Sequence, residues 1–299
     1  MIEGKGISKS FEDLEALKNV NINVNKGSIY GLVGSNGAGK TTLLKTLVGI
    51  YKQDSGEVLI DGENIFENVN IKSRVIFIPD MLYFFSQYSA KDMAKFYKRI
   101  YKTWDEERYL KLRDAFNIDE NKKVNNLSKG MQRQVAFWLA LSVQPDILIL
   151  DEPLDGLDPV MRQKVKNLIV QDVAEKQMTV LISSHNLREL EDLCDYIGIM
   201  HKGSLILEKD LDDLKLDIHK IQVAFKESVK EEILKDVNIL YEEERGSVKL
   251  FIVRGKKEEI VDQISKYDPV ILDILSLTLE EIFIYEMGDV GYEIKNIIF

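Results

Sequence analysis

One segment, residues 34–42 with the sequence GSNGAGKTT, constrains the fold of this chain more than any other. It matches G-x-x-x-x-G-K-[ST], the pattern of the phosphate-binding loop called Walker A. Residues 28–33, which are mostly apolar, predict a short buried strand before it, and residues 41–48 predict a helix after it. Such a unit gathers glycine N–H groups and a helix N-terminus around one point, and both attract phosphate. We therefore expect a nucleotide to bind here.

Every residue of this loop is a candidate for contact with the nucleotide. The candidates are Gly34, Ser35, Asn36, Gly37, Ala38, Gly39, Lys40, Thr41 and Thr42. Lys40 can reach the β- and γ-phosphates, the Thr41 hydroxyl can ligate Mg²⁺, and Thr42 can bond a further phosphate oxygen. A chance glycine-rich turn with a surface lysine would match the same pattern, but the flanking strand and helix favour a nucleotide site.

A second strand carries acidic residues at its end. Residues 147–150 are all apolar and are followed by Asp151 and Glu152. A continuous apolar run predicts a buried parallel strand, and open α/β sheets bind ligands at the carboxyl ends of such strands. Asp151 suits a Mg²⁺ contact through water, and Glu152 suits polarising a hydrolytic water. Two acids in a surface turn would be the alternative, which so apolar a strand disfavours.

Two weaker signals point to the same ligand. The apolar strand predicted for residues 178–184 ends at His185, where an imidazole would meet a γ-phosphate. Ser128 and Gly130 precede a predicted helix and would form an anion site from a hydroxyl, a glycine N–H and a helix N-terminus. An ordinary helix N-cap has the same local sequence, so this signal is weak by itself.

Phe11 is a candidate for contact with a nucleotide base. It lies in the predicted loop 9–13, between strands predicted for residues 2–8 and 20–24. Its ring is suited to stacking on adenine. A half-buried loop aromatic would have the same local sequence, and the local pattern alone favours that interpretation.

Composition limits the remaining possibilities. A chain of 299 residues is long enough for two domains with proper cores. Its formal net charge of −10 disfavours a nucleic-acid partner, which needs a basic surface. The single cysteine, Cys194, cannot form an intrachain disulfide and is expected to be a small buried residue. No apolar run is long enough to cross a bilayer, so a membrane role is expected to be peripheral, through a partner.

Two other regions have patterns of their own. Residues 81–126 are rich in aromatic residues and predict a helical subdomain, in which Ser89 and Asp92 resemble a capping box. Its aromatic residues are expected to be mostly core, with a few near residues 83–88 available as a docking surface. Beyond residue 214 the pattern predicts a β-α-β-β-α-β unit with no catalytic constellation. Its predicted elements are strand 220–225, helix 229–235, strands 237–241 and 248–253, helix 256–267, strand 270–274 and helix 279–287.

The ordered set of motifs resembles an ATP-binding subunit of an ABC transporter. Walker A, the signature-like residues 127–132, the Walker B strand, residues 156–158 and His185 occur in the order typical of that family, over about residues 1–210. The resemblance implies an α/β P-loop NTPase core of the ABC type in residues 1–214, with a helical subdomain at about 81–129. A small C-terminal α+β domain of the split-βαβ type, residues 215–299, would follow, as in exporter-type subunits with an extension.

The resemblance also implies roles and partners. ATP would lie between two such chains, identical or closely related, with Ser128 and Gly130 of one facing the Walker A loop of the other. Asp158 would communicate across this dimer. Further implied roles are adenine stacking for Phe11, Mg²⁺ support for Asp151, action on the attacking water for Glu152 and a γ-phosphate contact for His185. The chain would be cytoplasmic, bound to the membrane through a separate permease, and would power export.

The sequence departs from the family at two places. The signature segment has Leu-Ser-Lys-Gly-Met instead of Leu-Ser-Gly-Gly-Gln, but it keeps Ser128 and Gly130. More seriously, Asp80 occupies a position where the family usually has a glutamine that meets Mg²⁺. An aspartate can ligate Mg²⁺ directly, and we expect Asp80 to keep the metal contact. The alternative is a loop cap that points away.

Other functions remain possible on the sequence alone. A soluble ABC-type ATPase in translation usually has two ATP-binding halves, whereas this chain has one set of motifs. A DNA-repair ATPase would have a long coiled coil, and no sustained heptads occur here. A non-hydrolysing regulator is disfavoured by Glu152 and His185. For the C-terminal region we expect a stability or dimerisation role, and for the apolar tail, residues 292–299, packing on its own or a partner subunit.

Overall fold

The computed structural model describes residues 1–225, 237–282 and 285. The chain forms two compact units. One comprises Met1–His185 with Leu193–Glu208 and is called the cassette unit below. The other comprises Asn186–Asp192 with Lys209–Phe299 and is called the C-terminal unit.

The cassette unit is built around a sheet with the strand order β10-β9-β3-β8-β7-β6. The strands, in that order, are β10 (Ser204–Asp210), β9 (Tyr196–His201), β3 (Ile29–Val33), β8 (Thr179–Ser184), β7 (Ile147–Asp151) and β6 (Val75–Ile78). From β9 to β6 each neighbouring pair is parallel. Every residue of β3, β7 and β8 is buried, which explains why most of their residues are apolar. Their carboxyl ends therefore lie at one edge, where the polar residues follow.

A second, antiparallel sheet has the order β2-β1-β4-β5. Its strands are β1 (Ile2–Phe11), β2 (Leu14–Val24), β4 (Ser55–Ile60) and β5 (Glu63–Asn64). Helix α1 (Lys40–Leu47) packs between the sheets, and one core joins its Leu43 and Leu44 to Leu17 and Ile149. Phe11 is the last residue of β1 and pairs with Leu14. The prediction that Phe11 lies in a loop was therefore wrong, because the hairpin turn is shorter than the sequence pattern indicated.

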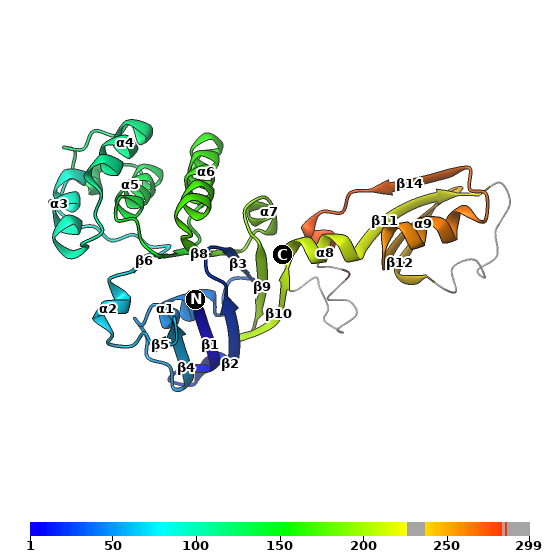
Figure 1. Ribbon diagram of the computed structural model, residues 1–299, viewed down its shortest axis with the longest axis horizontal. Helices are drawn as coiled ribbons and strands as arrows, with labels where there is room; N and C mark the ends of the chain where they lie inside the picture. The colour runs from blue at the N-terminus through cyan, green and yellow to red at the C-terminus, as the bar shows by residue number, and fades with distance from the viewer. Residues whose placement is uncertain (226–236, 283–284, 286–299) are drawn as a thin grey trace. The chain divides into compact units, whose positions relative to one another are not determined.

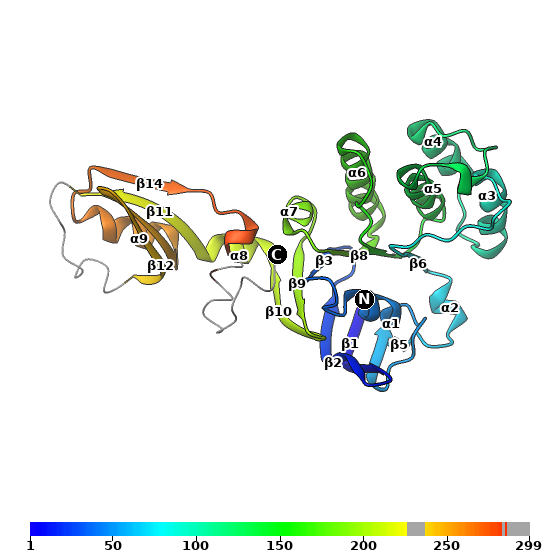
Figure 2. The same ribbon diagram turned by 180° about the vertical axis from the view of Figure 1, so that it is seen from behind.

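The helical subdomain follows β6. It contains α3 (Ala90–Ile100), α4 (Glu106–Phe116), the 3₁₀ turn η1 (Val124–Asn126) and the start of α5 (Lys129–Ser142). Both views show α3, α4 and α5 grouped together beyond β6 (Figures 1 and 2). The predicted capping box is confirmed, since Ser89 and Asp92 exchange side-chain and backbone hydrogen bonds at the start of α3. The Tyr109 and Trp138 rings stack with centroids 4.8 Å apart and join α4 to α5.

The cassette unit has two further helices, and a third short helix lies in the segment Asn186–Asp192. They are α2 (Val69–Lys72), α6 (Pro159–Lys176) and α7 (Leu187–Leu190), the last of which belongs to the C-terminal unit. Cys194 is buried, and burial raises the pKa of its thiol well above the usual range. Among the helices in the described part of the chain, none is long and apolar enough to cross a membrane.

The C-terminal unit contains an antiparallel sheet with the order β12-β13-β11-β14. Its elements are α8 (Leu211–Asp217), β11 (Ile218–Ala224), β12 (Asn238–Arg245), β13 (Val248–Arg254), α9 (Lys257–Ser265) and β14 (Ile271–Leu275). Helix α9 covers one face of the sheet, where Ile260 and Ile264 pack on Phe251 and Val253. This strand order is that of a split-βαβ sheet. Three predicted segments lie wholly or partly outside the described residues. They are the helix predicted for 229–235, residues 283–284 and 286–287 of the helix predicted for 279–287, and the tail 292–299.

Candidate nucleotide-binding site

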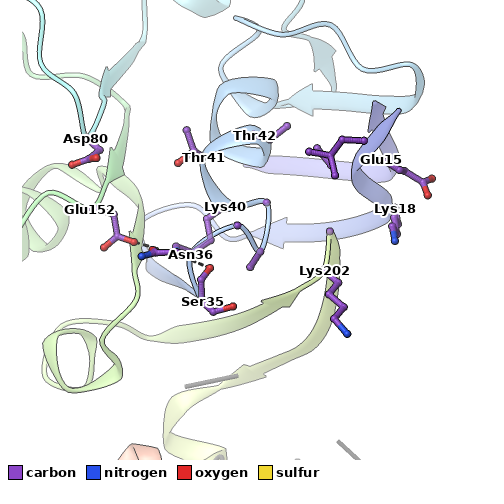
Figure 3. A pocket seen from close by; sticks show the side chains of 16 residues that line it. Glu15, Lys18, Ser35, Asn36, Lys40, Thr41, Thr42, Asp80, Glu152 and Lys202 are labelled. Atoms are coloured by element: carbon purple, nitrogen blue, oxygen red, sulfur yellow. Dashed lines mark hydrogen bonds and ion pairs between the residues drawn. The ribbon is translucent and has the colours of Figure 1, made fainter. Parts of the chain in front are cut away.

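A cavity of about 570 Å³ lies along the phosphate loop (Figure 3). Its volume is in the range of small-molecule sites. The residues that line it are Leu14, Glu15, Ala16, Lys18, Ser35, Asn36, Gly37, Ala38, Gly39, Lys40, Thr41, Thr42, Asp80, Glu152, Lys202 and Gly203. The structure thus brings eight of the nine loop candidates to one cavity, together with Glu152 and Asp80.

Close packing explains two glycines of the loop. A Cβ atom on Gly34 would lie 2.5 Å from the Met200 carbonyl oxygen, and one on Gly39 would lie 2.7 Å from the Ala16 carbonyl oxygen. Gly39 also has φ 105°, a conformation that residues other than glycine rarely adopt. Any larger residue at either position would have to displace backbone, so these glycines set the path of the loop into α1.

Lys40 is the first residue of α1 and is almost fully buried. Its Nζ donates to the Gly34 carbonyl oxygen at 2.6 Å and lies 3.2 Å from Glu152 Oε1. A buried ammonium needs such partners, because desolvation is costly. The Lys40 cation is therefore held inside the loop, beside the carboxylate that follows β7.

Asp151 ends β7 and is 1% exposed. Its Oδ2 accepts a hydrogen bond from Thr41 Oγ1 at 2.8 Å, and its Oδ1 accepts one from Ser183 Oγ at 2.7 Å. Ser183 Oγ in turn accepts from the Glu152 N–H at 3.0 Å. Sequence reasoning missed Ser183. The signal was available, since parallel strands that end at the same edge place Asp151 opposite Ser183.

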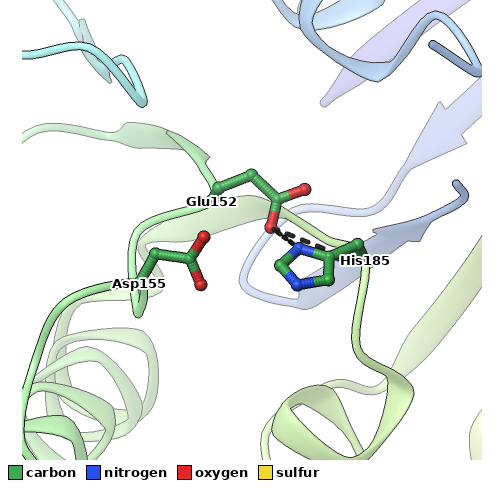
Figure 4. Close-up of side chains that lie close together, drawn as sticks. All are labelled: Glu152, Asp155 and His185. Atoms are coloured by element: carbon green, nitrogen blue, oxygen red, sulfur yellow. Dashed lines mark hydrogen bonds and ion pairs between the residues drawn. The ribbon is translucent and has the colours of Figure 1, made fainter. Parts of the chain in front are cut away.

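Glu152 forms a polar cluster with Asp155 and His185 (Figure 4). Its Oε2 is 2.9 Å from His185 Nδ1 and also accepts from the His185 N–H at 3.2 Å. One potential metal-ligating atom from each of Glu152, Asp155 and His185 lies within 4.8 Å of the other two. The Glu152 side chain is 13% exposed and that of His185 is 48% exposed. A partly shielded carboxylate between Lys40 and His185 can accept a proton from a water molecule within hydrogen-bond distance.

The candidates at the N-terminal ends of α5 and α6 lie outside the cavity. Its lining, as far as the chain is described, includes neither Ser128, Gly130 nor Asp158. Ser128 caps α5, and Asp158 caps α6 by accepting from two N–H groups. Gly130 lies in the first turn of α5, where a Cβ would be 2.6 Å from the Gly156 carbonyl oxygen. Within one chain, these residues are therefore helix caps and a close helix–loop contact.

Phe11 and Asp80 also have contacts that the sequence did not predict. The Phe11 ring packs edge-on against Tyr51, with centroids 5.2 Å apart, and Phe11 is not among the described residues that line the cavity. The Asp80 carboxylate lies in the cavity lining, but its Oδ1 is 3.1 Å from Nη2 of Arg133. Arg133 was also missed, because its partner is 53 positions away in the sequence.

Comparison with known proteins identifies the family. YtrB, an ABC transporter ATP-binding protein of Bacillus subtilis (strain 168), is 35% identical over 288 residues, which cover 96% of this chain and 98% of YtrB. The chain belongs to the ABC transporter ATP-binding proteins. The profile described as ABC transporter matches residues 17–155 of this family member. The bacitracin transport ATP-binding protein BcrA of Bacillus licheniformis is 35% identical over 218 residues, 72% of this chain and 71% of BcrA.

Solved ABC cassettes have the same fold. A bacterial ABC transporter cassette with a dimeric structure matches 71% of this chain and 99% of its own length, with a TM-score of 0.65 and 25% identity. That cassette was also solved as a dimer in a post-hydrolysis state with ADP and Pi bound, with a TM-score of 0.64. The predicted ABC-type P-loop fold is thus confirmed. This ABC transporter ATP-binding protein binds and hydrolyses ATP, and it serves transport.

Proposed function

We propose that this chain is one of a pair of ATPase subunits that drive export through a separate permease, with the Glu152 cluster as the hydrolytic centre. One observation carries the proposal. Glu152 is held between Lys40, at 3.2 Å, and His185, at 2.9 Å, at the edge of the cavity that the phosphate loop lines. A carboxylate, a cation and an imidazole thus converge where a terminal phosphate would lie.

The residues divide the work of hydrolysis between them. The loop N–H groups and Lys40 bind the β- and γ-phosphates, and Lys40 exchanges its contacts with the Gly34 carbonyl and Glu152 for phosphate oxygens. Glu152, relieved of the lysine, orients the attacking water and accepts its proton. The His185 main-chain N–H keeps Glu152 in place, which leaves the imidazole available to contact the γ-phosphate. Catalysis is then mainly positioning plus stabilisation of charge on the transferring group.

The donor set near the loop suits Mg²⁺. Thr41 Oγ1 and Asp151 Oδ2 are oxygen atoms 2.8 Å apart, and magnesium prefers oxygen ligands. These two residues would hold the ion directly or through water, and the bound ion would neutralise charge on the β- and γ-phosphates. The Asp80 carboxylate is engaged by Arg133, so a metal contact from Asp80 would require that pair to separate.

The second half of the site is proposed to come from another chain. Ser128 and Gly130 lie at the N-terminus of α5, where N–H groups favour an anion, yet neither lines the described cavity of their own chain. A second chain that placed this helix end over the γ-phosphate would complete the binding of ATP. The dimeric cassette with 25% identity supports such pairing. Asp158 would then lie near the contact between the two chains.

The proposal also concerns the transported cargo and the membrane partner. BcrA is a bacitracin transport protein, and similarity to it supports transport of a compound of that kind. The match to YtrB over 96% of this chain includes most of residues 215–299, which we propose to be an accessory domain for stability or pairing. The permease would be a separate chain, and the ATPase would act on the cytoplasmic face of the membrane. A role in translation or repair has no support from these relatives.

Steady-state ATP hydrolysis by the full chain tests the hydrolytic centre. Lys40→Ala should abolish phosphate binding, whereas Lys45→Ala, a matched change in the same helix, should leave turnover near wild type. Glu152→Gln should still bind ATP and lose most of its turnover. Wild-type turnover in Glu152→Gln would contradict the assignment. Affinity purification of the chain from membranes, followed by identification of a hydrophobic subunit, tests the permease; its repeated absence would count against it.

A further inference from the structure

A buried arginine links three parts of the ATPase site. Arg133 lies in α5 and is 7% exposed. Its Nη2 donates to the Asp80 carbonyl oxygen at 2.7 Å and to Asp80 Oδ1 at 3.1 Å. Its Nη1 donates to the carbonyl oxygen of Glu152. One guanidinium group thus joins the helix after the signature segment, the loop after β6 and the end of β7.

Glu152, whose carbonyl oxygen accepts the hydrogen bond from Arg133, has an unusual backbone conformation. Glu152 has φ 45°, in the left-handed region that residues with a side chain seldom adopt. Such a conformation persists only where the surroundings fix it. The Glu152 N–H is bonded to Ser183 Oγ and its carbonyl oxygen to Arg133, while its two carboxylate oxygens contact Lys40 and His185. Among the described residues, the side chains of Arg133 and Ser183 therefore both hold the main chain of Glu152.

We propose that Arg133 is a positioning residue for ATP hydrolysis, which fixes the carbonyl of Glu152 and is itself fixed by Asp80. The inference rests on the proposed role of Glu152. It gives Asp80 a role other than metal ligation: the carboxylate is the counter-ion of a buried guanidinium. Because an arginine fork holds two acceptors in fixed geometry, it sets the direction of the Glu152 peptide as well as neutralising Asp80.

The chemistry sets the size of the expected effects. Arg133→Gln removes the charged donor to the Glu152 carbonyl, and kcat should fall about 10- to 100-fold, the worth of one such bond when it is needed in the transition state. KM for ATP should stay within about twofold, because Arg133 does not line the cavity among its described residues. Asp80→Ala removes one partly exposed ion pair, and kcat should fall at most about fivefold.

A double-mutant cycle in the full chain tests the proposal. We expect kcat of the Asp80→Ala, Arg133→Gln double variant to equal that of Arg133→Gln, because Asp80 acts only through Arg133. The apparent Mg²⁺ requirement should be the same in Asp80→Ala and wild type. Wild-type kcat in Arg133→Gln, multiplicative losses in the double variant, or a raised Mg²⁺ requirement in Asp80→Ala would each overturn the proposal.

Two controls separate positioning from general stability. Arg108→Gln removes another shielded arginine, whose Nη2 is 2.8 Å from the buried Asp172 carboxylate. It should lower stability and leave kcat of the folded fraction near wild type. If Arg133→Gln fails to fold by circular dichroism, Arg133→Lys decides: a lowered kcat at unchanged KM supports the proposal, and a wild-type kcat overturns it. Glu152→Gln is measured in parallel, because wild-type turnover there would overturn the proposed function itself.

Discussion

Replacing Ser183 by alanine tests the network beneath the site. Ser183 is completely buried at the end of β8. Its hydroxyl donates to Asp151 Oδ1 at 2.7 Å and accepts from the Glu152 N–H at 3.0 Å. Ser183→Ala removes both bonds with a minimal change in volume. Asp151 keeps the bond from Thr41, so the aspartate is not left without a donor.

The two lost bonds set the magnitude. A hydrogen bond to a charged group contributes about 1.5–3 kcal/mol, and an N–H left buried without a partner costs about 1–3 kcal/mol. Because Asp151 retains one donor, we take the lower part of both ranges and expect a loss of about 3 kcal/mol in the free energy of unfolding. Turnover should also fall, since Glu152 loses the anchor of its main-chain N–H.

Urea unfolding of the full chain measures this loss, with Ser142→Ala as the matched control. Ser142 is also completely buried, and its hydroxyl donates only to the Trp138 carbonyl within α5. The control should lose about 1 kcal/mol, the worth of one neutral bond, and keep its turnover. A Ser183→Ala variant no less stable than Ser142→Ala, with normal turnover, would refute the claim that Ser183 holds both acidic residues.

Two further predictions concern packing and the thiol. Gly130→Ala should lose about 1–3 kcal/mol in thermal unfolding, because its Cβ would lie 2.6 Å from the Gly156 carbonyl oxygen. Lys129→Ala, a change at the exposed neighbouring residue, should not lose this stability. Equal stability of the two variants would contradict this packing argument. The Cys194 thiol should not react with a disulfide reagent at pH 8 in the folded chain, because burial raises its pKa and a thiol below its pKa stays protonated. Unfolding in urea should restore its reaction, and rapid labelling without urea would contradict the burial.

The positions of the main motifs followed from local patterns. A parallel strand covered on both faces must be apolar throughout, so β7 was recognisable from its sequence and its end marked the acidic residues. The capping box at Ser89 and Asp92 was also predictable, because both partners lie within one helical turn. In each case the interaction is local or repeats along one element.

The contacts that fix Glu152 did not follow from such patterns. Arg133 reaches Asp80 and Glu152 from another element, and nothing in its neighbouring residues indicates where its side chain points. The contact of Ser183 with Asp151 could be predicted only from the strand order, because it depends on the pairing of β7 with β8. Phe11 was misplaced because the alternation of residues does not fix the residue at which a strand ends.

The account depends most on the claim that two chains complete one ATP site. Sedimentation of the full-length Glu152→Gln variant, with ATP and Mg²⁺ and then without nucleotide, tests it most directly. Because that variant keeps the binding groups and loses hydrolysis, ATP should convert it to a dimer, and additional Ser128→Arg substitution should prevent the conversion. A Glu152→Gln chain that binds ATP stoichiometrically and stays monomeric at every protein concentration would contradict the account.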